Sequence, residues 1–146
     1  DEKAHGWDIT LNKKFSDTVS AFVGYTHTTI DATEQRGPSA DGYVPKNTWN
    51  IGIDYSENKW NASLQGRANV NRTGPSNISG VFPDDTYWVW DIALNYQADK
   101  NTKIFAKVNN LLDKFYAENS NVAWGAPGQW YAAPGRNILM GVEYSF

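Results

Sequence analysis

Residues 60–70 read WNASLQGRANV, an almost unbroken alternation of apolar and polar side chains. The apolar positions are Trp60, Ala62, Leu64, Ala68 and Val70, and most positions between them hold Asn61, Ser63, Gln65, Arg67 and Asn69. Successive side chains of a strand point to opposite faces of the sheet, so a period of two predicts a strand with one apolar and one polar face. This run is also longer than the roughly five or six residues of an average strand.

The same period recurs in six other segments, which cover residues 7–15, 19–28, 49–56, 88–97, 103–112 and 138–146. Phe22, Phe105 and Leu111 depart from it. Short turns join the first segment to the second, the third to the fourth and the fifth to the sixth. Longer loops, at about residues 32–47, 72–86 and 113–136, join the rest and contain all six prolines. We predict an all-β fold, an antiparallel up-and-down meander of about seven or eight long strands, forming a single β-barrel segment over residues 1–146 with no plug domain.

Pairing apolar with apolar side chains across each hairpin predicts the strand registers. It requires a three-residue turn at 16–18, a two-residue turn at 57–58 and a three-residue turn at 98–100. Asn58 suits the positive φ that a tight hairpin turn demands. The predicted cross-strand pairs are Phe15 with Val19, Tyr55 with Trp60, Trp49 with Gly66, and Asp91 with Lys107, the last as an ion pair on the polar face.

The composition argues against several classes of protein. A net charge of -3 offers no basic surface for nucleic acid, and the absence of cysteine excludes disulfides and thiolate metal sites. His5 and His27 are the only histidines, and no catalytic or phosphate-binding motif accompanies them. No apolar run approaches the roughly 20 residues of a membrane-spanning helix. We expect neither an enzyme nor a cofactor, and no metal centre.

Short turns at one end and long loops at the other are typical of an outer-membrane β-barrel. Aromatic residues lie near the strand ends, where such barrels meet lipid headgroups, namely Trp7, Trp49, Trp60, Trp88, Tyr25, Tyr55, Tyr96 and Tyr144. Polar faces rich in Asn, Gln, Ser, Arg and Asp suit a watery lumen. A soluble antiparallel sandwich or lipocalin-like barrel, with its apolar face packed inward, has the same period, so alternation alone does not separate the two.

The number of strands adds a constraint. In a meander of seven strands the first and last run parallel and cannot close a barrel of antiparallel neighbours, and single-chain bacterial barrels have even strand numbers. The chain is therefore either an arc of a larger barrel or a small barrel with an eighth strand, for which residues 129–132 or those before Gly6 are candidates. An isolated arc has bare edges, so we expect the fragment to self-associate.

Two stretches near the end of the chain resemble a known family. Residues 107–116, KVNNLLDKFY, resemble the NLxDxxY element in the penultimate strand of TonB-dependent outer-membrane receptors, through Asn110, Leu111, Asp113 and Tyr116. The aromatic terminus that follows Pro134, Gly135 and Arg136 resembles the last strand of the same family. The strands upstream of residue 107 match the family in style rather than by motif.

The resemblance implies a function. Members of this family are large barrels with an N-terminal plug, and they import ferric siderophores, haem, cobalamin or similar scarce ligands with energy delivered through TonB. It implies that this chain is the C-terminal barrel part of such a receptor in the cell outer membrane, roughly its last third, with a ferric chelate or similar ligand as cargo. Nothing in residues 1–6 resembles the TonB-contacting box, so TonB is expected to act only through N-terminal parts missing from this chain.

Several residues become candidates for specific roles. In outer-membrane proteins an aromatic last strand resembles the signal that the barrel-assembly machinery reads as an added strand, which points to Val142, Tyr144 and Phe146. In the last long loop, Trp124, Trp130, Tyr131 and Arg136 form an aromatic and cationic set suited to a flat, anionic iron chelate. The alternative is that these four residues only pack the loop onto its neighbours. Arg67 is expected to line the lumen or to contact a plug.

Overall fold

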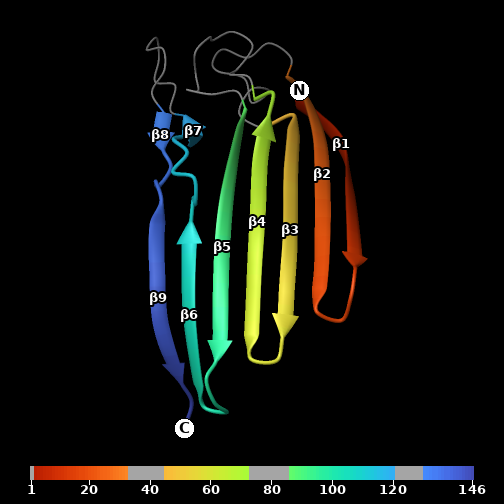
Figure 1. Ribbon diagram of the computed structural model, residues 1–146. Coiled ribbons are helices and arrows are strands. Elements are labelled where there is room, and N and C mark those ends of the chain that lie inside the picture. The colour runs from red at the N-terminus through yellow and green to blue at the C-terminus, as the bar shows by residue number, and fades with distance from the viewer. Residues whose placement is uncertain (1, 33–44, 73–85, 121–129) are drawn as a thin grey trace.

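The protein forms one long, open antiparallel sheet (Figure 1). The computed structural model describes residues 2–32, 45–72, 86–120 and 130–146. Seven strands follow one another as a meander: β1 (Glu2–Lys14), β2 (Val19–Ala32), β3 (Asn47–Glu57), β4 (Trp60–Val70), β5 (Tyr87–Gln97), β6 (Thr102–Asn109) and β9 (Asn137–Tyr144). Two short strands, β7 (Ala117–Ser120) and β8 (Trp130–Ala132), form a separate ribbon between β6 and β9 in the chain. The predicted antiparallel meander is confirmed.

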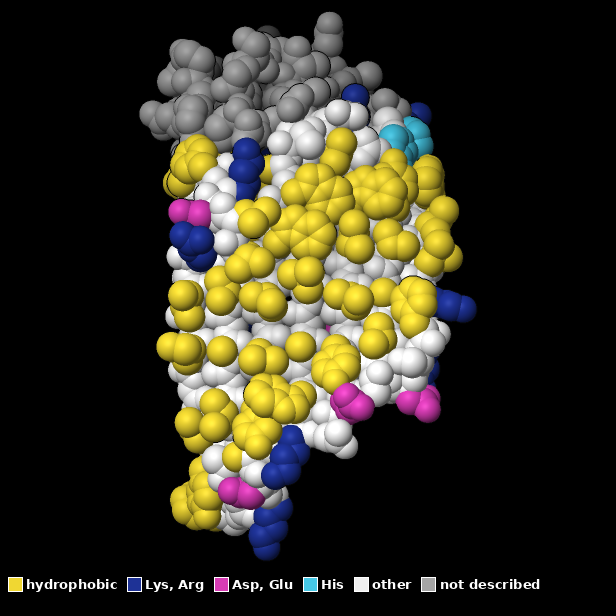
Figure 2. Space-filling model, viewed as in Figure 1, with side chains coloured by type: hydrophobic (Ala, Val, Ile, Leu, Met, Phe, Trp, Pro, Cys, Tyr) yellow, Lys and Arg dark blue, Asp and Glu magenta, His cyan; other side chains and the backbone are white. Residues whose placement is uncertain are grey.

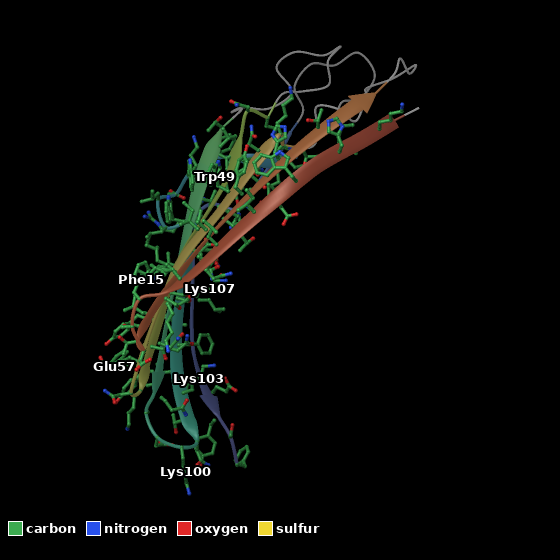
Figure 3. All side chains as sticks on the ribbon, turned by 90° about the vertical axis from the view of Figure 1, so that its right-hand side faces the viewer. Phe15, Trp49, Glu57, Lys100, Lys103 and Lys107 are labelled. Carbon is green, nitrogen blue, oxygen red and sulfur yellow. The ribbon has the colours of Figure 1, made fainter. Side chains whose placement is uncertain are left out.

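The sheet is curved and does not close on itself. In the described part of the chain β1 pairs with β2 alone and β9 with β6 alone. Of the two segments proposed as an eighth strand, residues before Gly6 extend β1, and residues 130–132 form β8, which pairs with β7. Seen from its edge, the sheet is bowed, with Phe15 on one side and Lys103 and Lys107 on the other (Figure 3). The architecture is an arc with two free edges.

One face of the sheet is an exposed apolar surface. Many of its large side chains are between 38 % and 72 % exposed, among them Trp7, Ile9, Leu11, Ile53, Trp60, Ile92, Ile104, Met140 and Val142. Figure 2 shows hydrophobic side chains spread over this face of the sheet. No second layer covers it within the described residues. The interpretation as a soluble sandwich with its apolar face packed inward is therefore not what the fold shows.

The residues that interrupt the alternation lie over glycines of neighbouring strands. Phe22 is opposite Gly52, and a Cβ built on that glycine would lie 2.1 Å from the phenylalanine ring. Phe105 has the same relation to Gly141, with a closest approach of 2.6 Å. Both pairs lie on the polar face, where the missing glycine side chain makes room for the ring. Phe22 and Phe105 thus depart from the alternation because their rings fill the space that these glycines leave.

The structure confirms one predicted turn and shifts two. Phe15 donates to the carbonyl of Val19 at 2.9 Å across the three-residue turn at 16–18, as predicted. The second turn consists of Asn58 and Lys59, so Tyr55 faces Ala62 rather than Trp60. Asn58 has φ 51°, the positive value expected of it. A slip of two residues keeps every side chain on its own face, so the facing rule does not detect it.

The third turn is shifted for a chemical reason. The carboxylate of Asp99 accepts hydrogen bonds from the amides of Asn101 (2.8 Å) and Thr102 (3.0 Å), which centres the turn on residues 99–101 instead of 98–100. Asp91 therefore does not face Lys107, which is opposite Ala93, and the predicted ion pair is wrong.

The prediction for Trp49 is also wrong. Trp49 is opposite Ala68, while Gly66 is opposite Trp90 of β5, whose ring would lie 2.6 Å from a Cβ on that glycine. A tryptophan does cover the bare backbone of Gly66, but it comes from the strand on the other side.

Candidate functional site

At the end of the sheet where β2 and β4 end, the chain leaves β6 and folds against the polar, concave face. β6 pairs with β5 only from Ile92 to Gln97, so the first part of β5 has no β6 neighbour. At that point the amide of Leu111 donates to the carbonyl of Trp90 at 2.7 Å, and Asn110 takes the left-handed conformation with φ 51°. Asparagine tolerates this conformation better than most residues, which is why the strand turns here.

Asn110 joins the two stretches that carry the family resemblance. Its side chain is 3 % exposed, accepts from the amide of Lys114 (2.8 Å), and donates to the carbonyls of Lys114 (2.8 Å) and Pro134 (3.3 Å). Both the nitrogen and the oxygen of the side-chain amide are used in the chain reversal. The segment that leaves β6 is thereby tied to the segment that enters β9.

Asp113 makes a second link between the same segments. Its Oδ1 accepts the amide of Arg136 at 2.8 Å, and its φ is 54°. That oxygen would lie 3.1 Å from a Cβ on Gly135, so a side chain there would crowd the carboxylate. The guanidinium of Arg136 donates to the carbonyl of Leu111 at 3.4 Å. Of the residues that carry the family resemblance, Asn110, Leu111, Asp113, Pro134 and Arg136 therefore form one hydrogen-bonded joint. Gly135 packs against the carboxylate of Asp113, and Tyr116 lies outside the joint.

Tyr116 meets a charged cluster on the concave face. Arg67 of β4 donates from Nη1 to Oδ2 of Asp91 at 3.0 Å and from Nη2 to the hydroxyl of Tyr116 at 2.7 Å. Oε1 of Glu118 lies 3.8 Å from the same Nη2. The other oxygen of Asp91 accepts the amide of Asn110 at 2.8 Å. Arg67 lies on the polar face as predicted, and Asp91 connects it to the joint around Asn110.

A second arginine lies just past the end of β4. Arg72 is 4 % exposed and donates to the main-chain carbonyls of Ala117 (2.8 Å) and Glu118. Burial is the largest influence on this guanidinium and lowers its pKa, although the nearby carboxylate of Glu118 acts in the opposite direction. Because arginine begins from a very high pKa, it keeps its charge at neutral pH.

A small apolar core accompanies the charged cluster. Tyr87, Val89 and Tyr116 are at most 4 % exposed, and Ala133 packs against them. The rings of Tyr87 and Tyr116 are 4.8 Å apart. This core lies beside the arginines, so the chain after β6 is held by both packing and charge.

The structure places the four candidate ligand contacts in different ways. Trp124 lies outside the described residues, and the strand β8 contains the backbone of Trp130. Tyr131 in β8 is 64 % exposed. Arg136 is also exposed, and its hydrogen bonds are with Asp113 and Leu111. The described residues do not show these four side chains as one cluster.

Sequence reasoning missed Arg72, Tyr87 and the role of Asp91. Asp91 lies on the polar face as predicted, but its partner is Arg67 and not Lys107. The sequence signal for the Arg67–Asp91 ion pair was that both residues lie on the polar faces of adjacent strands. No sequence motif marks Arg72 or Tyr87.

Two groups of aromatic side chains lie on the apolar face. Towards the end of the sheet where β3 begins, the ring of Tyr25 is 5.1 Å from Trp7 and 4.5 Å from Trp49. Towards the short turns, Trp60 and Tyr96 are 4.4 Å apart. The aliphatic row containing Ile53, Leu64, Ile92 and Ile138 runs between the two groups in the register of the sheet. Aromatic bands on either side of an aliphatic band are the arrangement that suits two lipid–water interfaces.

The last strand ends in exposed apolar residues. Val142 is 67 % exposed and Tyr144 59 %, and Phe146 is fully exposed. The rings of Tyr144 and Phe146 meet edge to face at 5.2 Å. Val142 and Tyr144 face outward with the rest of the apolar surface, as the alternation predicts.

Other site types are not found in the described parts of the chain. There is no group of three or more histidine, cysteine or acidic side chains arranged to hold a metal ion. His27 instead shares Oδ1 of Asn47 with the hydroxyl of Tyr25, at 2.8 Å from its Nδ1. The described residues contain no helix that is long and apolar enough to cross a bilayer.

A curved sheet with an apolar convex face between aromatic bands and a polar concave face is the wall of a transmembrane β-barrel. The family model described as "TonB dependent receptor-like, beta-barrel" matches residues 1–111, and the chain belongs to this family. Its members are transporters rather than enzymes, and their barrels reside in the outer membrane. The family model matches the strands up to residue 111, whereas most residues of the two sequence motifs that resemble the family come after residue 111.

Named relatives agree with this assignment. The chain is 25 % identical over 153 aligned positions to the metal-pseudopaline receptor CntO of Pseudomonas aeruginosa strain UCBPP-PA14, covering 99 % of this chain and 21 % of that protein. The siderophore receptor PiuA from Acinetobacter baumannii superposes with a TM-score of 0.72 at 22 % identity, covering 98 % of this chain and 22 % of PiuA. The chain thus spans about a fifth of the length of these relatives.

Two further structures share the fold. The ferric-catecholate import receptor Fiu from Escherichia coli K12 gives a TM-score of 0.73 at 19 % identity, over 99 % of this chain and 21 % of Fiu. The copper transporter OprC gives 0.70 at 20 % identity, over 99 % of this chain and 24 % of OprC. The relatives therefore carry different metals, and the likeness shows the barrel wall that they have in common.

Proposed function

We propose that this chain is the C-terminal part of the barrel of a TonB-dependent receptor that imports a metal ion bound to an organic chelator. In this proposal residues 1–146 form one barrel segment, and the plug and the TonB-contacting region belong to other parts of the same receptor. Its apolar face contacts outer-membrane lipid, and its concave face lines the passage. A ferric chelate is the leading cargo, since the relatives include receptors named for siderophores and ferric catecholates.

The observation that carries this proposal is the two-faced, open sheet. Both edges, β1 and β9, have no further partner strand in the described structure, and the whole arc superposes on about a fifth of complete receptors. An exposed sheet edge needs another strand to satisfy its backbone groups in lipid. The rest of a larger barrel supplies those strands on both sides.

Uptake measurements test the proposed transport. A strain lacking the full-length receptor would be complemented with the wild-type gene and supplied with radioactive iron bound to a catecholate or to a hydroxamate, and with copper or nickel bound to an aminocarboxylate. We expect one or more of these complexes to accumulate only when both the receptor and TonB are present. Uptake that persists without TonB, or no uptake of any complex above the deletion strain, contradicts the proposal.

We further propose that Trp124, Trp130, Tyr131 and Arg136 contact the cargo. Aromatic and arginine side chains are enriched among residues that dominate binding energy. Replacing Tyr131 by alanine is expected to raise the concentration for half-maximal uptake about tenfold. Leu112, which is 68 % exposed, provides a control, because its replacement by alanine removes similar apolar area outside the proposed contact set.

Finally, we propose that Val142, Tyr144 and Phe146 form the signal read by the barrel-assembly machinery. Alternating exposed apolar side chains at the end of β9 are suited to recognition as an added strand. Replacement of Phe146 by alanine is expected to lower the amount of folded receptor in the outer membrane without changing uptake per folded molecule. Replacing the solvent-facing Ser145 by alanine is the matched control.

A further inference from the structure

The ribbon formed by β7 and β8 is too small to hold its own position. Its ladder contains three residue pairs, Ala117 with Ala132, Asn119 with Tyr131 and Ser120 with Trp130, and it is irregular between Ala117 and Asn119. A two-stranded ribbon of this size is marginally stable in water. Contacts with the seven-stranded sheet must therefore decide where it lies.

Two arginines, one in β4 and one just past its end, reach the start of this ribbon. Arg67 on β4 binds the hydroxyl of Tyr116, directly before β7, at 2.7 Å. Arg72, just past the end of β4, donates to the carbonyls of Ala117 (2.8 Å) and Glu118, the first two residues of β7. Three consecutive residues of the chain, 116–118, are thus bound by arginines in or next to β4.

The two arginines hold the ribbon in different ways. Arg72 is buried and binds two successive main-chain oxygens, a geometry that the planar guanidinium fork provides and an ammonium group does not. A buried charge that lost these acceptors would be strongly destabilised, so Arg72 and β7 are bound to each other. Arg67 is itself fixed by the carboxylate of Asp91, 3.0 Å away, and this orients its second nitrogen toward Tyr116.

We infer that Arg67 and Arg72 are positioning residues that hold the β7–β8 ribbon against the concave face, so that the ribbon forms a fixed part of the passage wall. The ring of Tyr116 packs against that of Tyr87 in β5, and this contact sets where the ribbon touches the sheet. The two arginines restrict rotation of the ribbon about this contact. The consequence for transport rests on the proposed function. The position of the ribbon does not, because it follows from the contacts alone.

Distance measurements between two labels test the position directly. Residues 1–146 contain no cysteine, so in this part of the receptor spin labels attach only to Ala132→Cys in β8 and Ser63→Cys in β4. Any cysteine elsewhere in the full-length receptor is first replaced by serine. We expect a narrow distance distribution with both arginines present and a broad one in the double variant Arg67→Met, Arg72→Met. Lys107→Met is the matched control, because it removes a cation from the same face opposite Ala93, and it should leave the distribution narrow.

Milder variants cover the case in which the double variant does not assemble. Tyr116→Phe removes only the hydroxyl that accepts from Arg67, and the pair Arg67→Lys, Arg72→Lys keeps the charge but not the fork. Both should widen the distribution less than the methionine pair. A distribution as narrow as that of the wild type in each assembled variant would overturn the inference, and would assign the ribbon's position to tyrosine packing alone.

Uptake of iron bound to a catecholate supplies a second readout. The methionine pair should raise the concentration for half-maximal uptake about tenfold, the loss expected from a displaced binding wall, while the maximal rate per folded receptor stays within about twofold. The lysine pair should recover part of the affinity. If the maximal rate of uptake falls together with the affinity while the distance distribution stays narrow, the positioning role is wrong. If the wild type takes up no complex, the proposed function fails, and the distance distributions still decide the inference.

Discussion

The guanidinium of Arg67 meets the carboxylate of Asp91 at 3.0 Å on the concave face, although the two residues are not opposite each other in the sheet. Arg67 faces Val89, and Asp91 faces Gln65, so the ion pair runs diagonally between β4 and β5. The second oxygen of Asp91 accepts the amide of Asn110. One carboxylate therefore fixes a lumen-facing arginine and the place where the chain leaves the sheet.

Replacing Asp91 by asparagine should destabilise the receptor through both contacts. The side chain of Arg67 is 42 % exposed, so solvent screens the ion pair, and we expect a loss of about 1–2 kcal/mol rather than the value for a buried pair. Urea unfolding in phospholipid vesicles measures this free energy. Asp54→Asn on the same face, opposite Ser20 and Ser63, is the control and should cost less than about 0.5 kcal/mol. Equal losses in the two variants would contradict the role given to Asp91.

Glycine 52 should not tolerate a side chain, because the ring of Phe22 occupies the space above it. A Cβ at Gly52 would lie 2.1 Å from that ring, whereas a Cβ at Gly24 would meet nothing closer than 3.6 Å. We expect Gly52→Ala to destabilise the fold by about 1–3 kcal/mol and Gly24→Ala to be nearly neutral. Combining Gly52→Ala with Phe22→Ala should cost less than the sum of the two single changes, as unfolding experiments on the double-mutant cycle can show.

A charge on the convex face should be poorly tolerated, and the same charge one residue further along should be accepted. Ile92 lies in the aliphatic row of the apolar face, and Ala93 points to the concave face. We expect Ile92→Lys to cost about 2–4 kcal/mol in vesicles, the range for lysine near the bilayer midplane. Ala93→Lys should cost well under half of that. If Ala93→Lys cost more than Ile92→Lys, the lipid would contact the concave face, and the assignment of the two faces would be wrong.

The turn at residues 99–101 should weaken in acid. Hydrogen bonds from the amides of Asn101 and Thr102 lower the pKa of Asp99 below its ordinary 3.8. Because the folded state has the lower pKa, the stabilisation is complete at about pH 5 and above, and it is lost as the pH falls through the unfolded and then the folded value. Asp99→Asn should therefore flatten the acid limb of the stability curve, measured as the unfolding midpoint between about pH 6 and pH 3. An unchanged acid limb would show that the carboxylate is not bound to the turn.

The alternation of side chains was enough to predict the seven strands of the main sheet, their order and the two faces of the sheet, but not the short strand β7. It failed at registers where a slip of two residues keeps every side chain on its own face, as between Tyr55 and Ala62. The turn chemistry of Asn58 and Asp99 decided those registers. The positive φ of Asn58 was foreseen, but its place as the first residue of the turn was not.

The candidate site divides in the same way. The motif around Asn110 and Asp113 could be found in the sequence, and the structure shows it bound to the segment around Arg136. The diagonal pairing of Asp91 with Arg67 and the burial of Arg72 could not be found, because they depend on strands and segments that are far apart in the chain.

The sequence by itself determined which residues share the apolar face of the sheet and which share the polar face, because a strand places neighbours on opposite faces whatever surrounds it. Only the tertiary structure decided which polar residues touch, since those contacts depend on register, on sheet curvature and on the point where the chain leaves β6. Arg67, Arg72 and Tyr116 come together for that reason and not because of any local pattern.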